Sequence, residues 1–471
     1  MGQRIRRRDF LKSSTAALAG ASMPYWFTST SNLALGRQSV NDRPVLGCIG
    51  TGDRWNSVGR NAMEFSDCVA VCDVDRNHLE KARDHVVKTQ SERGHSTAPE
   101  MYEDYRKLLD RKDVQVVTIV TTDHWHSKIA IEAMQAGKDV YCEKPLTLTI
   151  LEGKQIIKVL NETKRVFQVG TQQRSDMSAN DGAIKNQFLK AVAIARSGRL
   201  GTLKKVTCTI GSAPTSEELP VVPVPSGLNW EKWLGQAPLT EYVQGKTDEK
   251  KHRPESRAHY EFRWWYEYSG GKMTDWGAHH VDIGMWALGM DDSGPISVEG
   301  TAVHPVELKN GMPTASNRYN VATDFNVTAK FANGAELYIQ SEGDNGVLLE
   351  GTEGRIFVSR SRLTGAPVEE LANKPLPESL LKELYKGRLN KEGKNAHMEN
   401  FFDCVKDRGM PVSDVYSHHR AMTTCHLANI AIRLGRRIEW DPKTEQIIND
   451  KDAAHWIGRE QRKGYEINVS V

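Results

Sequence analysis

The sequence lacks a long apolar run, because no stretch reaches the roughly 18 consecutive apolar residues that a membrane-spanning helix needs. It also lacks an excess of charge of one sign, since 63 Lys and Arg residues stand against 60 Asp and Glu residues. Residues 1–36 carry a net charge of +4, so the remaining chain carries −1. A nearly neutral body has no electrostatic reason to bind nucleic acid or an anionic membrane. We therefore expect neither partner.

Cysteines and metal-binding motifs are also scarce. The chain has seven cysteines, no paired C-x-x-C and no H-E-x-x-H. An odd number of cysteines at these spacings indicates neither a disulfide framework nor a zinc ribbon, so we expect free, buried thiols. His124 and His126 would point to opposite sides of an extended chain. No metal is predicted, although residues of ligand type stand in the motifs described below: Asp123, His124, His126, His279, His280 and Asp282.

The N-terminus has the layout of an export signal. Residues 6–12 read Arg-Arg-Arg-Asp-Phe-Leu-Lys, which resembles the twin-arginine signal of bacteria. A mildly apolar segment follows at 13–27, and residues 34–36, Ala-Leu-Gly, are typical of a cleavage site. We expect residues 1–36 to be a signal peptide that engages the twin-arginine export machinery and directs the protein to the periplasm. The alternative is a basic tail with no targeting role.

Short apolar runs alternate with helical patterns in the first third of the chain. The runs lie at residues 44–52, 69–73, 114–120 and 139–142. This alternation predicts βαβ units and a parallel sheet that is buried on both faces. We assign residues 42–165 to a Rossmann dinucleotide-binding domain of the α/β class.

The pattern then changes to that of an antiparallel sheet. Apolar and polar residues alternate over 325–331, and an Asn-Gly hairpin signal follows at 333–334. We expect residues 166–395 to form an α+β domain for substrate binding and oligomerisation, with an open, mostly antiparallel sheet and helices on one face. Helical stripes predict that residues 396–440 form C-terminal helices packed back on the core, and residues 441–471 are assigned to a C-terminal tail.

A glycine turn ends the first apolar run. Residues 50–52 read Gly-Thr-Gly, and glycines there let the backbone approach a pyrophosphate at the start of a helix. The third glycine of G-x-G-x-x-G is replaced by Trp55, and Gly59 indicates a longer loop. Asp73 ends the second run, where an acid binds both ribose hydroxyls of NAD and repels the 2′-phosphate of NADP. NAD is therefore the predicted cofactor, and NADP is disfavoured.

Three further motifs occur in order along the chain. Residues 121–126 read Thr-Thr-Asp-His-Trp-His, residues 143–145 read Glu-Lys-Pro, and residues 270–282 read Gly-Gly-Lys-Met-Thr-Asp-Trp-Gly-Ala-His-His-Val-Asp. Together with residues 169–174 and 228–235, they resemble the Gfo/Idh/MocA family, the relatives of glucose–fructose oxidoreductase and inositol dehydrogenase. The resemblance extends from about residue 44 to residue 440.

The resemblance implies a Rossmann domain followed by an open antiparallel sheet, with the substrate between them. It implies that Lys144 contacts the substrate hydroxyl and stabilises a developing alkoxide, and that Asp275 and His279 form an acid/base pair. Their i, i+4 spacing places both on one helical face, so we expect the aspartate to orient the imidazole. A histidine near its ordinary pKa suits this proton transfer. His280 is the alternative histidine.

Two sets of residues are assigned to the ligands. The cofactor-binding set is Gly50, Thr51, Gly52, Arg54, Asp73, Thr121, Thr122, His126, Glu143, Lys144 and Gln172. Tryptophans and tyrosines crowd the second domain, and flat aromatic faces with a polar edge suit sugar rings, although core packing accounts for many of them. The substrate set is Arg174, Arg263, Trp264, Trp276 and His280. A sugar or polyol is the predicted substrate class.

Export constrains the function, because free NAD is not expected outside the cytoplasm and a bound NAD must be regenerated on the protein. The first hypothesis is an exported NAD-dependent oxidoreductase that acts on the CH–OH group of a sugar, polyol or sugar derivative, with His279 as acid/base. The second is an NAD-using glycoside hydrolase or lyase that works by transient oxidation and elimination. The third is a non-catalytic sugar-binding protein on the same scaffold. The family's open sheet implies a homo-oligomer, a dimer or a tetramer.

Overall fold

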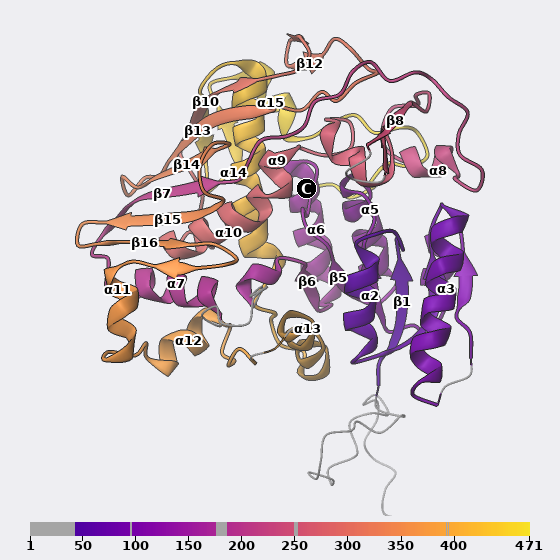
Figure 1. The fold of residues 1–471 in the computed structure, drawn as a ribbon, viewed down its shortest axis with the longest axis horizontal. Coiled ribbons are helices and arrows are strands. Elements are labelled where there is room, and N and C mark those ends of the chain that lie inside the picture. Colours follow the sequence, from indigo (N-terminus) through magenta and orange to yellow (C-terminus); the bar gives the residue numbers. More distant parts are fainter. Residues whose placement is uncertain (1–42, 95–96, 176–185, 249–252, 392, 394) are drawn as a thin grey trace, which may run out of the picture. The chain divides into compact units, whose positions relative to one another are not determined.

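The computed structural model describes residues 43–94, 97–175, 186–248, 253–391, 393 and 395–471 (Figure 1). The expected signal peptide, residues 1–36, lies outside this described part. Within it, no helix is both long and apolar enough to cross a membrane. All seven cysteines fall inside it, and they are buried and free of disulfides, as the sequence predicts.

A six-stranded parallel sheet occupies the first part of the described chain (Figure 1). Its order is β3-β2-β1-β4-β5-β6, and its strands are β1 (Val45–Ile49), β2 (Asp67–Cys72), β3 (Glu100–Tyr102), β4 (Val116–Ile119), β5 (Asp139–Cys142) and β6 (Phe167–Val169). The connecting helices are α2 (Trp55–Met63), α3 (Arg76–Ser91), α4 (Tyr105–Leu109), α5 (Asp123–Gln135) and α6 (Ile150–Thr163). This is the predicted Rossmann sheet, and β6 lies beyond residue 165. The strand order reverses between β1 and β4, which places a crevice at their carboxyl ends.

Side chains of the sequence mark where these helices begin. Asp75 accepts a hydrogen bond from the Asn77 amide at the start of α3, and Thr149 accepts one from the Glu152 amide at the start of α6. α5 begins at Asp123, an acid in the first turn, where the helix dipole favours negative charge. These helix starts follow the carboxyl ends of the parallel strands, so polar groups gather along one edge of the sheet.

A nine-stranded mixed sheet forms the second part of the structure. In the order β17-β16-β15-β7-β14-β13-β10-β18-β19, β7 and β14 run parallel and the other neighbouring pairs run antiparallel. The strands are β7 (Leu203–Thr209), β10 (Ser297–Val303), β13 (Asp324–Lys330), β14 (Glu336–Gln340), β15 (Gly346–Gly351), β16 (Arg355–Val358), β17 (Leu363–Thr364), β18 (Ile438–Asp441) and β19 (Gln446–Ile448). Three helices pack against its strands: α7 (Gln187–Arg196), α10 (Gly277–Leu288) and α14 (Val415–Leu434). The predicted mostly antiparallel sheet with helices is confirmed.

An aromatic segment lies between β7 and α10. It contains α8 (Trp230–Leu234), β8 (Gln244–Asp248), β9 (Arg253–Ser256) and η4 (His259–Trp264). Trp264 is buried in a cluster with Trp233, Trp265 and Tyr268, and its indole N–H donates to Glu261 Oε2 over 2.6 Å. The structure therefore places Trp264 in a core instead of at a ligand, which corrects its assignment to the substrate.

The C-terminal residues pack against both sheets. In α13 (Ala396–Asp407), Phe402 stacks on Phe65 of the Rossmann region, with the ring centroids 5.6 Å apart. Residues 441–471, assigned to a tail, contain β19 and α15 (Lys451–Ala454), and Lys128 Nζ of α5 donates to the Glu466 carbonyl over 2.8 Å. This segment is thus built into the fold.

The remaining short elements are η3 (Gln172–Arg174), β11 (Leu308–Lys309), β12 (Met312–Pro313), α11 (Ala366–Glu369), η5 (Glu370–Ala372), α12 (Glu378–Leu384) and η6 (His455–Ile457).

A buried ion pair joins η3 to α10. Arg174 Nε and Nη2 donate to the two carboxylate oxygens of Asp282, each over 2.7 Å, and both side chains are 1% exposed. Arg174 Nη1 donates to the Val412 carbonyl, and the guanidinium lies over the Trp286 ring at 4.8 Å. This bidentate geometry occupies the polar edge of the guanidinium. The structure corrects the prediction that Arg174 binds substrate, because it fixes Arg174 in the core.

Breaking this pair is expected to be costly. Asp282→Asn removes the bidentate counter-charge of a buried guanidinium and leaves the longer 3.7 Å contact to Asp291, so the free energy of unfolding should fall by about 3 kcal/mol in urea denaturation. Arg83→Ala, which removes the exposed pair with Asp84, is the control and should cost at most about 1 kcal/mol. Similar losses for the two variants would contradict the structural role of the buried pair.

Candidate functional site

A cleft of about 520 Å³ lies at the carboxyl ends of the parallel strands. Its opposite wall comes from η4 and α9 (Lys272–Asp275) of the second domain. The structure therefore brings the glycine turn, the Glu-Lys-Pro motif and the Asp–His pair to one cavity. The predicted site residues that line it are Gly50, Gly52, Arg54, Asp73, Thr121, Thr122, Glu143, Lys144, Gln172, Arg263, Asp275, Trp276 and His279.

The turn after β1 requires glycine at its first position. Gly50 has φ +78°, and a Cβ there would lie 2.6 Å from the Thr121 amide nitrogen. Trp55 is buried as the first residue of α2, and a Cβ at Gly59 would lie 2.3 Å from its indole ring. Gly59 thus makes room for the Trp55 side chain inside α2. This corrects the interpretation of Gly59 as a sign of a longer loop.

Asp73 is held in place by the same turn. Its Oδ2 accepts hydrogen bonds from the Thr51 amide over 2.6 Å and from the Thr51 hydroxyl over 3.2 Å, and its Oδ1 accepts one from the Asp75 amide. Thr51 is buried and positions Asp73 without lining the cleft. The carboxylate consequently lies at the cleft beside the glycine turn, where an acid meets a nucleotide ribose in Rossmann domains.

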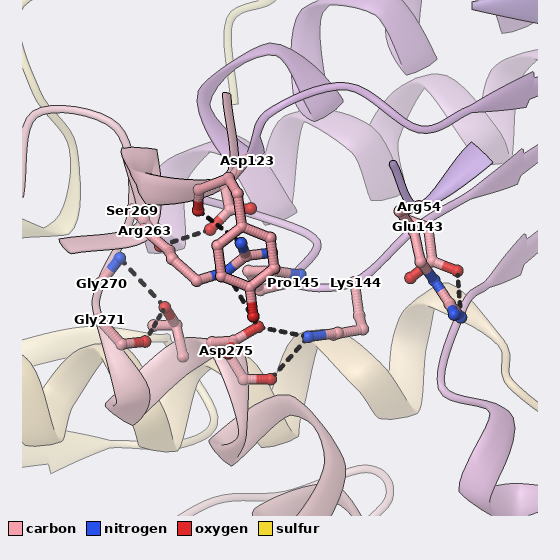
Figure 2. A network of polar contacts seen from close by, with 12 residues as sticks. Arg54, Asp123, Glu143, Lys144, Pro145, Arg263, Ser269, Gly270, Gly271 and Asp275 are labelled. Carbon is pink, nitrogen blue, oxygen red and sulfur yellow. Dashed lines mark hydrogen bonds and ion pairs between the residues drawn. The ribbon is translucent and has the colours of Figure 1, made fainter. Parts of the chain in front are cut away.

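An ion pair connects the two walls of the cleft, as Figure 2 shows. Lys144 Nζ donates to Asp275 Oδ1 over 2.6 Å and to the Asp275 carbonyl over 2.9 Å, and Arg263 Nε lies 3.8 Å from the same carboxylate oxygen. Burial acts to raise the pKa of Asp275, but the charges of Lys144 and Arg263 outweigh it and hold the pKa well below its usual range. Asp275 is therefore a carboxylate, and Lys144 keeps its counter-ion.

His279 lies in the first turns of α10 and has a buried Nδ1 with no hydrogen-bond partner in the described part of the chain. The structure therefore corrects the expectation that Asp275 orients this imidazole by a hydrogen bond to its Nδ1. The carboxylate is turned to Lys144 and Arg263 instead, and α9 ends at Asp275 before α10 begins. Burial, and then the positive charge of Lys144, lowers the pKa of His279 well below its ordinary value. The imidazole is therefore neutral at physiological pH. This corrects the expectation that the pKa of His279 is close to its ordinary value.

Glu143 organises the cleft on the other side of Lys144 (Figure 2). Its Oε1 accepts hydrogen bonds from Arg54 Nη2 over 3.1 Å and from Gln172 Nε2 over 2.7 Å. A Cβ at Gly170 would lie 2.7 Å from the same oxygen, so a glycine leaves space for the carboxylate. This cluster holds Glu143 beside Lys144 in the lining of the cavity, and the Lys144–Pro145 peptide that follows is cis.

Comparison with known proteins identifies the architecture. Residues 45–171 match the NAD-binding Rossmann fold of the Gfo/Idh/MocA oxidoreductases, and residues 212–467 match the C-terminal alpha/beta domain of the same family. The chain belongs to the Gfo/Idh/MocA oxidoreductase family. The predicted resemblance is confirmed. The N-terminal match also confirms that this domain is an NAD-binding Rossmann domain.

Similar proteins include both hydrolases and oxidoreductases. A glycosyl hydrolase family 109 protein of Shewanella baltica is 32% identical over 186 residues, which cover 34% of this chain and 38% of that protein. The chain thus matches little more than a third of that relative's length. The WlbA dehydrogenase of Bordetella pertussis, solved with NADH and UDP-GlcNAcA, superposes with a TM-score of 0.57 at 17% identity over 85% of this chain and 99% of that one. The aldose–aldose oxidoreductase of Caulobacter crescentus gives 0.55 at 16% identity over 84% and 99%.

Two assigned histidines of this Gfo/Idh/MocA protein lie outside the cleft. His126 is buried, with Nδ1 2.9 Å from the Pro145 carbonyl and Nε2 3.1 Å from the Thr121 carbonyl, so it holds two loops together. His280 is fully buried, with Nδ1 3.2 Å from Gln173 and Nε2 2.9 Å from Asn345 Oδ1. These positions correct the assignment of His126 to the cofactor and of His280 to the substrate. Of the two adjacent histidines, only His279 lines the described cleft.

Asp123 is a cleft residue, whereas the sequence indicated for it only a side chain of metal-ligand type. It lines the cavity at the start of α5 and accepts a hydrogen bond from the Ser269 hydroxyl over 2.6 Å (Figure 2). Burial raises its pKa to about 7, against the opposing effects of Ser269 and Arg263. Its position shortly after strand β4 could have predicted a place at the cleft. The sequence did not show its burial, which is the cause of the raised pKa. Arg360 also lines the cleft and lies over the Trp276 ring at 4.6 Å, and no sequence motif predicted it as a site residue.

The raised pKa of Asp123 predicts a pH-dependent stability. The native state keeps a proton that the unfolded state loses as pH rises from about 4 to about 7, so stability should fall by up to about 1.4 kcal/mol per pH unit in that window. Asp123→Asn removes this titration and should gain stability relative to wild type as pH rises, in urea denaturation at several pH values. The exposed Asp84→Asn is the matched control. Parallel pH curves for wild type and Asp123→Asn would contradict the assignment.

Proposed function

We propose that this protein is an NAD-dependent oxidoreductase that acts on the CH–OH group of a sugar, polyol or sugar derivative. The observation that carries the proposal is the meeting of three features in one cleft: an NAD-type glycine turn with Asp73, an ammonium group on Lys144, and the neutral imidazole of His279. A cation beside a neutral base is what the oxidation of a hydroxyl group requires.

The chain's own residues fit the cofactor. Gly50, where a Cβ would collide with the Thr121 backbone, holds the glycine turn at the cleft, where such a turn can bind a diphosphate, and Asp73 presents a carboxylate for ribose hydroxyls. That carboxylate would repel a 2′-phosphate, so NAD is favoured over NADP. Bound NAD supplies the acceptor for the hydride that leaves the substrate carbon.

His279 and Lys144 handle the proton and the charge. As the substrate CH–OH becomes C=O, the imidazole of His279 takes the hydroxyl proton, and the Lys144 ammonium stabilises the negative charge that develops on the oxygen. Asp275 holds the Lys144 ammonium at the cleft through the 2.6 Å ion pair. Arg263 and Trp276 line the same cavity and are the proposed contacts for the sugar ring.

A second candidate is an NAD-using glycoside hydrolase or lyase, favoured by the likeness to the family 109 glycosyl hydrolase. A ketone formed by transient oxidation acidifies the neighbouring C–H, so that a base removes this proton and the leaving group departs. In a hydrolase, water would then add to the unsaturated ketone in place of the leaving group, whereas a lyase would omit this addition; in both, return of the hydride to the carbonyl carbon would leave no net NADH. Asp123, with a pKa of about 7, is an acid of suitable strength to protonate a leaving group.

Export and assembly are part of the proposal. We propose that residues 1–36 direct the folded protein through the twin-arginine route with NAD bound, and that the protein forms a homo-oligomer through its open sheet. Cell fractionation tests the first point, since a protein confined to the cytoplasm would contradict it. Light scattering tests the second, since a monomer at working concentration would contradict it.

The activity test uses two readouts on one panel of sugars, polyols and nitrophenyl glycosides. An oxidoreductase should change nicotinamide absorbance at 340 nm, whereas the hydrolase or lyase should release nitrophenol without net NADH. Lys144→Ala and His279→Ala should each lower kcat by roughly 10²-fold or more, because oxyanion stabilisation and general-base catalysis each contribute at least that much.

The control for both variants is the exposed Lys374→Ala, which should leave turnover unchanged. Retained NAD binding and a cooperative unfolding transition in Lys144→Ala and His279→Ala would show that each variant is folded and that chemistry is lost. Unchanged turnover in both variants would contradict the catalytic assignment. Nucleotide and sugar binding without turnover on any member of the panel would favour a sugar-binding protein instead.

A further inference from the structure

A second cluster of ligand-type residues lies at the rim of the cleft, on the side of Asp73. One side-chain donor atom each of Asp75, His78 and His259 lies within 4.8 Å of the other two. Asp75 Oδ2 and His259 Nε2 are 3.1 Å apart, and the two imidazole rings have centroids 4.9 Å apart. None of these residues has a part in the hydroxyl oxidation described above.

The acid of this cluster is held rigidly by the backbone. Asp75 is 5% exposed and forms a β-bridge with Leu228, and the neighbouring Arg76 amide donates to the Gly227 carbonyl. One of its carboxylate oxygens, Oδ1, accepts from the Asn77 amide as the N-cap of α3. The other oxygen is left to face the histidines.

The two histidines approach the Asp75 carboxylate from separate parts of the fold, His259 to 3.1 Å and His78 to within 4.8 Å. His78 lies in the first turn of α3, three residues after Asp75, and lines the cleft. His259 begins η4 in the second domain, with φ +51°, a left-handed conformation that non-glycine residues adopt at a cost of about 1–3 kcal/mol. The surrounding structure maintains this conformation, which directs the His259 ring toward Asp75.

We propose that Asp75, His78 and His259 form a binding site for a divalent transition-metal ion of the zinc type. Two imidazoles and one carboxylate are a ligand set that zinc uses with an open fourth position. Donor atoms about 2.1 Å from a tetrahedral zinc ion are about 3.4 Å apart, close to the 3.1 Å between Asp75 and His259. The fourth position faces the cleft, which both histidines line.

A metal ion here would tie η4 to the start of α3. It would close the cleft on the side of Asp73, away from Lys144 and His279, and so retain a ligand bound beside Asp73. A hydrogen bond between Asp75 and His259 alone would form the same contact without any need for His78. The contribution of His78 therefore separates the metal site from a simple hydrogen-bonded contact.

The test uses the purified full chain after chelator treatment, dialysed against Zn²⁺, with bound zinc measured by elemental mass spectrometry. Wild type should bind one Zn²⁺ per chain at this site, and Co²⁺ should give the visible absorption of a tetrahedral site. His78→Gln and His259→Gln should each weaken Zn²⁺ binding by roughly tenfold or more. Asp75→Asn should also weaken it while keeping the N-cap, because asparagine caps helices as well as aspartate does.

The matched control is His455→Gln, which removes an exposed histidine and should leave Zn²⁺ binding unchanged. Circular dichroism establishes that each variant is folded. Equal Zn²⁺ affinity in wild type and His78→Gln would overturn the proposal, as would the absence of stoichiometric Zn²⁺ binding in wild type. Because the assay contains neither nucleotide nor sugar, its failure would leave the proposed oxidoreductase activity untouched.

Discussion

The ion pair between Lys144 and Asp275 is the interaction on which the cleft depends. Lys144 follows strand β5 of the Rossmann sheet and Asp275 ends helix α9 of the second domain, so the pair joins the cofactor side to the substrate side. The pair is largely buried, so removing Asp275 would take from Lys144 the carboxylate that it binds, and removing Lys144 would leave Asp275 with the longer 3.8 Å contact to Arg263. Burial lowers the pKa of His279 and the same ammonium lowers it further, so the interaction that fixes the geometry also contributes to the protonation of the proposed base.

This arrangement balances the strengths of the base and the acid. A strongly lowered pKa keeps His279 neutral and able to accept a proton, but it also makes the imidazole a weak base. Lys144 compensates, because an ammonium beside the substrate oxygen makes the hydroxyl easier to deprotonate. Asp123 adds a carboxyl group with a pKa of about 7 to the same cavity, so the cleft contains groups that can give or take a proton near neutral pH.

Much of the architecture was predictable from the sequence, because strand ends and glycine turns are local signals. Gly50, Asp73 and Lys144 follow apolar runs, and parallel strands bring their carboxyl ends to one edge. The roles of Arg174 and His280 were not predictable, since residue type and spacing do not reveal a partner that lies far away in the chain. Arg174 is satisfied by Asp282, 108 residues later, and both ring nitrogens of His280 have partners in the core.

The most direct test of the account is the binding of nicotinamide nucleotides by the purified protein. The protein is denatured to identify any released nucleotide by mass, and nucleotide-free protein is then titrated with NAD⁺ and NADP⁺ by calorimetry. The account predicts one NAD(H) per chain and a clear preference for NAD⁺, because Asp73 lies beside the glycine turn. A protein that contains no nucleotide and binds neither NAD⁺ nor NADP⁺ would contradict it.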